Sequence, residues 1–255
     1  MSNLIVNIKA VTLVRHSAFS KEREMSYGNV SAVLVHGAWA DGSSWGAVIE
    51  RLQRQGINAI AAPLPLTSLG DDIAALDRVL ERIDGPVVLA GHAYAGAVIG
   101  ATRAANVAGL VYVAALAPDE GETVGDVFHR GEPHPQAPQL APDRHGFIWL
   151  PTDASPRAFA QHATPQQLAV LAAVQRPIAA ACIGEAVGRP LWRDRPSWFL
   201  IAEQDRMIDP ATQRFTAERM KARVNSHAVD HTPIVTAPDI VTHVIVDALR
   251  TVAAR

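Results

Sequence analysis

Residues 86–96, with the sequence PVVLAGHAYAG, constrain the fold more than any other part of the chain. A short apolar run follows Pro86 and is long enough for one buried strand. Gly91 comes next, followed by the small Ala95 and Gly96, and small residues at these places let a helix start close against the end of a strand. The segment therefore predicts a buried strand that turns sharply into a helix.

The turn has nearly the spacing of the motif Gly-x-Ser-x-Gly, in which a strand-to-helix turn lifts the central side chain above a sheet. Here the central position is Ala93, and the last position is Ala95 rather than glycine. Alanine has no side-chain oxygen, so Ala93 can neither attack a carbonyl nor give a proton to a base. The sequence predicts the frame of a catalytic turn without its reacting atom.

From residue 30 onward, short apolar runs alternate with amphipathic segments, which is typical of stacked βαβ units. This pattern predicts an α/β fold with a mostly parallel central sheet flanked by helices. The expected strands are 30–36, 58–62, 87–90, 108–115, 198–202 and 224–229. The expected helices are one capped by Ser43 or Ser44, then 71–84, 93–105, one starting at Asp209-Pro210, and a terminal helix starting at Thr236.

The chain has 255 residues and is 49% hydrophobic, enough for one large core. We expect an N-terminal extension at 1–27, either an extra strand or disordered, and one domain at 28–255. The proline-rich segment at about 117–195 interrupts the regular pattern, with helical stretches near 157–162 and 164–174. An insertion of this length predicts a cap over the carboxyl ends of the strands, where substrate choice would be made.

Charge and hydropathy exclude several classes of partner. The formal net charge is −2 with no cluster of lysine and arginine, so no nucleic acid is expected. No apolar run approaches the roughly 18 to 20 residues that span a bilayer, so no membrane is expected. The N-terminus lacks the pattern of a signal peptide, which predicts a cytoplasmic location. Cys182 is the single cysteine and is expected to pack in an apolar setting.

Three further loops carry candidate catalytic groups. His36-Gly37-Ala38 follows the first strand, and the N–H groups of Ala38 and Tyr94 are candidates for an oxyanion hole. Asp205 ends a strand, where an acid that orients a histidine belongs, although Glu203 and Asp209 compete for this role. His231 follows the last strand and completes the order nucleophile position, acid, histidine.

Other side chains are candidates for a substrate site, namely Trp39, His92, Phe128, Trp149 and Trp192. The aromatic members favour a small apolar or aromatic substrate, although core packing explains Trp39 equally well. His129 and His134 lack a partner that completes a metal site, and we expect them to be solvated residues of the cap. No metal or cofactor is expected, and a homodimer is compatible with the sequence.

Together, Val33-Leu-Val-His-Gly-Ala-Trp39, the turn at Ala93, the Asp205 loop and the His231 loop resemble the α/β-hydrolase superfamily, most closely its small-esterase and hydroxynitrile-lyase-like branch. The resemblance covers residues 30 to 255. It implies an α/β-hydrolase fold with about eight strands or slightly fewer, no cofactor, and Ser-His-Asp chemistry on esters, lactones, carbamates or amides.

The alanine at position 93 departs from that family and leaves three interpretations. The chain is an inactivated Ser-to-Ala form of a serine hydrolase, which is the interpretation we favour. Alternatively, it is a natural enzyme that uses only His231 and Asp205, as a β-keto acid decarboxylase or a cofactor-free lyase or oxygenase. The third interpretation is a non-catalytic protein that holds a small ligand in the covered cleft.

Overall fold

A parallel sheet of six strands forms the centre of the protein in the computed structural model, which describes residues 27–255. The prediction for residues 1–27 lies outside the described residues, apart from Tyr27. The strand order is β2-β1-β3-β4-β7-β8, and every neighbouring pair is parallel. The strands are β1 Ser31–Val35, β2 Ala59–Ala62, β3 Val87–His92, β4 Val107–Val113, β7 Ser197–Ala202 and β8 Arg223–His227. All six predicted strands are confirmed, with ends that differ by a few residues.

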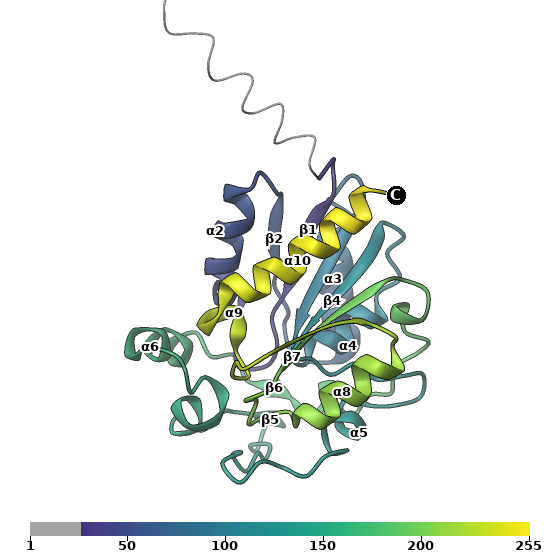
Figure 1. Cartoon of the computed structure of the whole chain (residues 1–255). Helices are drawn as coiled ribbons and strands as arrows, with labels where there is room; N and C mark the ends of the chain where they lie inside the picture. The colour runs from purple at the N-terminus through teal and green to yellow at the C-terminus, as the bar shows by residue number, and fades with distance from the viewer. Residues whose placement is uncertain (1–26) are drawn as a thin grey trace, which may run out of the picture.

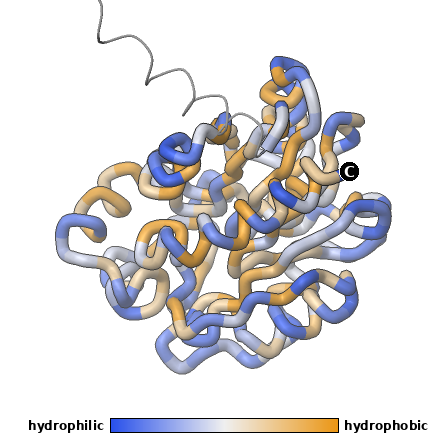
Figure 2. The backbone as a smooth tube through the Cα atoms, turned by 45° about the horizontal axis from the view of Figure 1, so that its top comes forward, coloured by the Kyte–Doolittle hydropathy of each residue, from blue (hydrophilic) through white to orange (hydrophobic). Residues whose placement is uncertain are grey.

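Helices cover both faces of the sheet (Figure 1). On one face, α2 Gly46–Arg54 and α10 Pro238–Ala253 pack in a core cluster that includes Trp45, Leu52 and Leu249. The opposite face carries α3 Leu69–Leu80, α4 Ala95–Ala101 and α8 Pro210–Arg219. The division follows the alternation of side chains along each strand, since Val33 and Val35 belong to one cluster and Ala32 and Leu34 to the other. In Figure 2, hydrophobic segments run through the middle of the molecule and many of the hydrophilic ones lie at its periphery.

Residues 117–195 lie below the sheet in Figure 1, beyond the carboxyl ends of the strands. This cap contains α5 Val124–Phe128, a short antiparallel pair of strands, a π-helix η2 at Ser155–Phe159, and α6 Pro165–Ala173. The paired strands are β5 Phe147–Ile148 and β6 Ile178–Ala179, followed by α7 Ala180–Gly184 and the 3₁₀-helix η3 Leu191–Arg193. Buried cap residues join the core cluster of α3 and α4, so the cap and this face form one hydrophobic core.

Two predicted helix starts are wrong. The 3₁₀-helix η1, Gly42–Trp45, which leads into α2, is capped by Asp41, whose carboxylate accepts from the Ser43 N–H at 2.8 Å. Neither Ser43 nor Ser44 has this role, because Asp41 is the residue with an extended backbone. Thr236 ends a short helix, α9 Pro233–Thr236, and its hydroxyl donates to Asp230, so α10 begins without a side-chain cap.

Candidate active site

Ala93 occupies the connection between β3 and α4 with φ of 51°, in the left-handed region that side-chain-bearing residues rarely adopt. Its N–H donates to Val113 O at 3.2 Å, and its carbonyl accepts from the Gly96 and Leu116 N–H groups at 3.1 and 3.0 Å. A Cβ at Gly91 would lie 2.9 Å from the carbonyl oxygen of Ala95, so a glycine is required there. These contacts hold the sharp turn that the sequence predicts.

His231 and Asp205 form a buried pair at the ends of two neighbouring strands. His231 follows β8, Asp205 follows β7, and Nδ1 of His231 lies 2.8 Å from Oδ2 of Asp205. A carboxylate only accepts hydrogen bonds, so Nδ1 carries a hydrogen, and in the neutral ring Nε2 is then the nitrogen with the lone pair. His231 and Ala93 both line one cavity, so a potential base and the residue at the centre of the turn face the same space.

The Asp205 carboxylate is itself held in place by neighbouring donors. Oδ1 accepts from the Met207 and Ile208 N–H groups at 2.7 and 2.9 Å. Oδ2 accepts from the side-chain amide of Gln213 at 2.8 Å, in addition to His231. Asp205 is only 3% exposed, and these donors offset the free-energy cost of removing its carboxylate from water. They also keep the carboxylate aligned with the imidazole.

The other acids near this edge of the sheet have different partners. Glu203 forms a salt bridge with Arg214 at 2.6 Å, and Asp209 caps α8 by accepting from the Ala211 N–H at 3.0 Å. Asp230 accepts from the His162 N–H at 2.9 Å and from Thr236. Asp205 is therefore the carboxylate that orients His231.

The loop after β1 brings a second group of atoms to the cavity. His36 Nδ1 donates to the Gly37 carbonyl at 3.0 Å, and Nε2 accepts from the Leu64 N–H at 3.0 Å, which fixes the peptide before Ala38. A Cβ at Gly37 would lie 3.1 Å from the Ala93 methyl group, so only glycine lets the loop approach the turn this closely. Ala38 and Tyr94 both line the cavity, and no hydrogen-bond acceptor within residues 27–255 takes either N–H.

Trp39 ties this loop to the cap. Its backbone N–H donates to Arg176 O at 3.0 Å and its indole N–H donates to Ile148 O at 3.0 Å. Trp39 has φ of 59° and also lines the cavity, as the sequence predicts. The cap is thereby fixed to the residue next to the candidate oxyanion donor Ala38.

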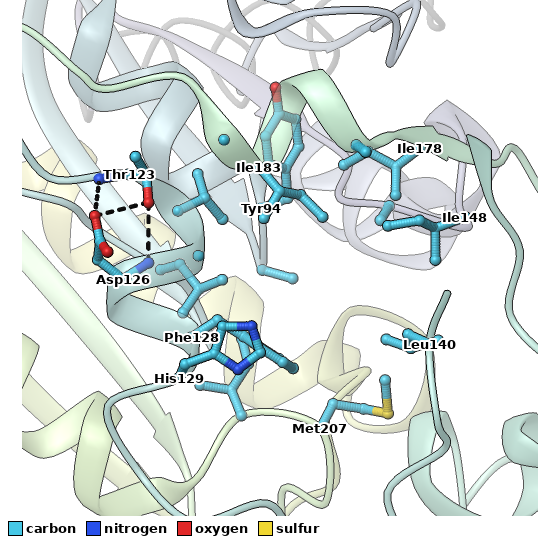
Figure 3. A pocket seen from close by; sticks show the side chains of 18 of the residues that line it. Tyr94, Thr123, Asp126, Phe128, His129, Leu140, Ile148, Ile178, Ile183 and Met207 are labelled. Carbon is cyan, nitrogen blue, oxygen red and sulfur yellow. Dashed lines mark hydrogen bonds between the residues drawn. The ribbon is translucent and has the colours of Figure 1, made fainter. Parts of the chain in front are cut away.

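The cavity has a volume of about 710 Å³ and is mostly apolar (Figure 3). Phe128 lines it, as expected, and the polar side chains Thr123, Asp126 and His129 lie together at one side. His129 was expected to be solvated, and it is exposed, but it also contributes to this wall. The sequence did not point to the other apolar residues of the wall, namely Leu116, Val124, Leu140, Ile148, Ile178, Ala180, Ile183, Met207 and Ile208. Met207 and Ile208 are two adjacent apolar residues in an otherwise polar loop after Asp205. This pattern is the one feature of the sequence that indicates part of the wall.

Three of the expected substrate contacts lie elsewhere. Trp149 is 51% exposed and its indole N–H donates to Asp143, whereas Trp192 packs in the core and donates to Pro118 O. Neither lines the cavity. His92 is fully buried behind the turn, and its Nε2 donates to the His231 carbonyl at 2.7 Å. Single aromatic residues in a loop-rich cap give no sequence signal of which side they face.

Two properties of the described residues bear on other classes of site. No group of three or more His, Cys, Asp or Glu side chains within residues 27–255 is arranged to hold a metal ion. Across the same range, no helix has both the length and the apolar character needed to cross a bilayer.

The fold is shared with several solved structures. A pyrethroid hydrolase from Sphingobium faniae JZ-2 is 22% identical, with a TM-score of 0.75 over 89% of this chain and 100% of that chain. Polyneuridine aldehyde esterase is 17% identical, with a TM-score of 0.69 over 85% and 98%. A methylesterase from Arabidopsis is 14% identical, with a TM-score of 0.72 over 87% and 99%.

A search of curated proteins gives no significant match. The sequence profile of the Alpha/beta hydrolase family, by contrast, matches residues 32–244, which include most of β1, the turn at Ala93, Asp205 and His231. The profile match and the six-stranded parallel sheet indicate the same family, and the chain belongs to the Alpha/beta hydrolase family.

Proposed function

We propose that this chain has the active site of a carboxylic ester hydrolase of the small-esterase and hydroxynitrile-lyase-like branch, in a form whose nucleophile is replaced by Ala93. One observation carries the proposal. The methyl group of Ala93 lines the same cavity as His231, which is paired with Asp205, and as Ala38 and Tyr94, whose N–H groups are unpaired within the described range. These observations support a serine hydrolase site that lacks only the hydroxyl of its nucleophile.

The roles of these groups follow from their chemistry. With a hydroxyl at position 93, Nε2 of His231 takes its proton while the oxygen attacks the ester carbonyl. Asp205 stabilises the imidazolium, and the Ala38 and Tyr94 N–H groups stabilise the oxyanion. His231 then protonates the leaving alkoxide, and water hydrolyses the acyl group. The Ala93 methyl cannot start this sequence, so this form is inactive or strongly impaired.

The cavity favours a neutral, apolar ester. Its lining includes no lysine or arginine among the described residues, and its one carboxylate is Asp126. A substrate with its own carboxylate would lose hydration on entering without gaining a cationic partner. This argues against a β-keto acid and supports an apolar or aromatic ester, whose surface the isoleucine, leucine and methionine side chains would contact.

A second candidate function uses the histidine and the acid alone. The observation that favours it is the pair itself, because Asp205 accepts three further hydrogen bonds besides that of His231 although no nucleophile is present. Such a pair can move a proton between atoms of a bound substrate, as in lyase chemistry. In that case the chain with Ala93 turns over a neutral substrate and loses this activity in His231→Ala.

The substitution Ala93→Ser tests the proposal directly. Assayed on neutral aryl esters, it should raise kcat/KM by at least about 10³-fold, with a burst of phenol that equals the enzyme concentration. The double variant Ala93→Ser/His231→Ala is the matched control and should return to the rate of the original chain. If the single variant folds normally and hydrolyses no ester faster than the original chain, the proposal is wrong.

A further inference from the structure

Asp72 is a fully buried carboxylate on α3 that belongs to none of the groups described above. No salt bridge within residues 27–255 involves it. Burial raises the pKa of this carboxyl group, and hydrogen-bond donors partly offset the effect. Placing a carboxylate in a core without a cation is costly, so its donors must account for its presence.

The donors to Asp72 come from three parts of the molecule. The Tyr94 hydroxyl donates to Oδ2 at 2.7 Å, and the Leu66 N–H donates to Oδ1 at 2.7 Å. The Cys182 thiol, on α7 of the cap, lies 3.7 Å from Oδ2. One side chain therefore joins the turn after β3, the connection between β2 and α3, and the cap.

The contact with Tyr94 bears on the candidate oxyanion hole. Tyr94 follows Ala93, and its hydroxyl points away from the cavity in Figure 3 while its ring forms part of the wall. The bond to Asp72 fixes the far end of this side chain, and the start of α4 fixes the near end. Because both ends of the side chain are held, the Tyr94 backbone has little freedom to turn its N–H, which has no acceptor among the described residues.

The contact with Leu66 bears on the position of the cap. Leu66 has φ of 59°, a strained conformation for a leucine, and its N–H is taken by Asp72. Its carbonyl accepts from the Ala179 N–H of β6 at 2.9 Å. Ile178, the other residue of β6, lines the cavity. Asp72 thus stabilises the turn on which this strand of the cap rests.

We infer that Asp72 is a positioning residue. It aligns the Tyr94 N–H with the cavity, and through Leu66 it holds β6 of the cap in its position. The inference rests on the proposed function for its effect on catalysis, but not for its effect on structure. An apolar residue at position 72 would fill the same space and leave the Leu66 N–H and the Tyr94 hydroxyl without a partner. An asparagine keeps the shape and one acceptor oxygen but replaces the second acceptor with a donor.

The structural part is tested on the full chain with Ala93, independently of any activity. The Tyr94 hydroxyl proton should give a slowly exchanging NMR resonance that is absent in Tyr94→Phe and displaced in Asp72→Asn. In Asp72→Asn, hydrogen exchange at the Ala179 amide should accelerate by about tenfold or more. Asp77→Asn is the matched control, because Asp77 lies on the same helix and accepts from Thr102 instead, and it should change neither signal. Unchanged resonance and exchange in Asp72→Asn would overturn the inference.

The catalytic part is tested in the Ala93→Ser chain. Asp72→Asn and Tyr94→Phe should each lower kcat by about tenfold with KM nearly unchanged, and the double variant should be no slower than the slower single variant. A folded Asp72→Asn variant with full kcat overturns this part of the inference. If Ala93→Ser itself is inactive, the proposed function fails, and the NMR and exchange measurements still decide whether Asp72 has the inferred structural role.

Discussion

Three buried histidines surround the candidate site, and each ring has a different task. His36 fixes the peptide before Ala38, His92 holds the backbone of His231, and His231 presents Nε2 to the cavity. Burial lowers the pKa of His36 and lowers that of His92 to about 3. His92 has no partner for Nδ1 among the described residues, which fits a ring that stays neutral.

The neutral state of His92 predicts a loss of stability in mild acid. The ordinary pKa of histidine is near 6.5, so between that value and about 3 the unfolded chain binds more protons than the folded chain. This contribution to the free energy of unfolding is complete above pH of about 6.5 and is lost as the pH falls, with a limiting slope of about 1.4 kcal/mol per pH unit. The free energy of unfolding, measured by urea titration at several pH values between 7 and 5, should fall less steeply with decreasing pH in His92→Asn than in the original chain.

The control for this measurement is His243→Asn, because it removes a histidine that is exposed on α10 and leaves the core intact. The pH dependence of the free energy of unfolding in His92→Asn is compared with that in His243→Asn. His36 contributes in the same direction, so His92→Asn should reduce the slope rather than remove it. If the free energy of unfolding depends on pH equally in His92→Asn and in the original chain, protonation of His92 does not destabilise the folded state, and the prediction is wrong.

At the scale of elements, the start of η1 and α2 offers a test of a corrected prediction. Asp41 accepts from the backbone N–H of Ser43, so Asp41→Ala should lower the free energy of unfolding by about 1 kcal/mol. Ser43→Ala is the control, because it keeps the backbone donor and removes only the hydroxyl that also reaches Asp41. A larger loss in Ser43→Ala than in Asp41→Ala, measured by thermal unfolding, would reverse the assignment of the cap.

The strands were predictable because their apolar runs are short, buried and separated by helical periodicity. That Ala93, Asp205 and His231 lie at one edge of the sheet was also predictable, because each follows a predicted strand and the carboxyl ends of parallel strands meet at one edge. The strands of the cap were not predictable from the sequence. β5 and β6 have two residues each, and they form only because two distant segments pair with each other. Asp72 gave no signal either, because a carboxylate in the first turn of a helix is usually exposed.

At the scale of the whole molecule, the cap and the sheet depend on each other. Buried cap residues share one cluster with α3 and α4, and hydrogen bonds join Trp39 to the cap on one side and Asp230 to His162 on the other. The second cluster, under α2 and α10, includes no cap residue. Substrate preference can therefore vary in the cap without disturbing that half of the core. The cytoplasmic location, the small-molecule substrate and the homodimer stay predictions.

Covalent labelling tests most directly whether position 93 faces a working base and oxyanion hole. The Ala93→Ser chain treated with an aryl fluorophosphonate should gain one adduct per chain, located at position 93 by mass spectrometry of its peptides. The original chain should gain none, and Ala93→Ser/His231→Ala should react far more slowly. A folded Ala93→Ser chain that stays unlabelled, or that reacts at another residue, would contradict the account.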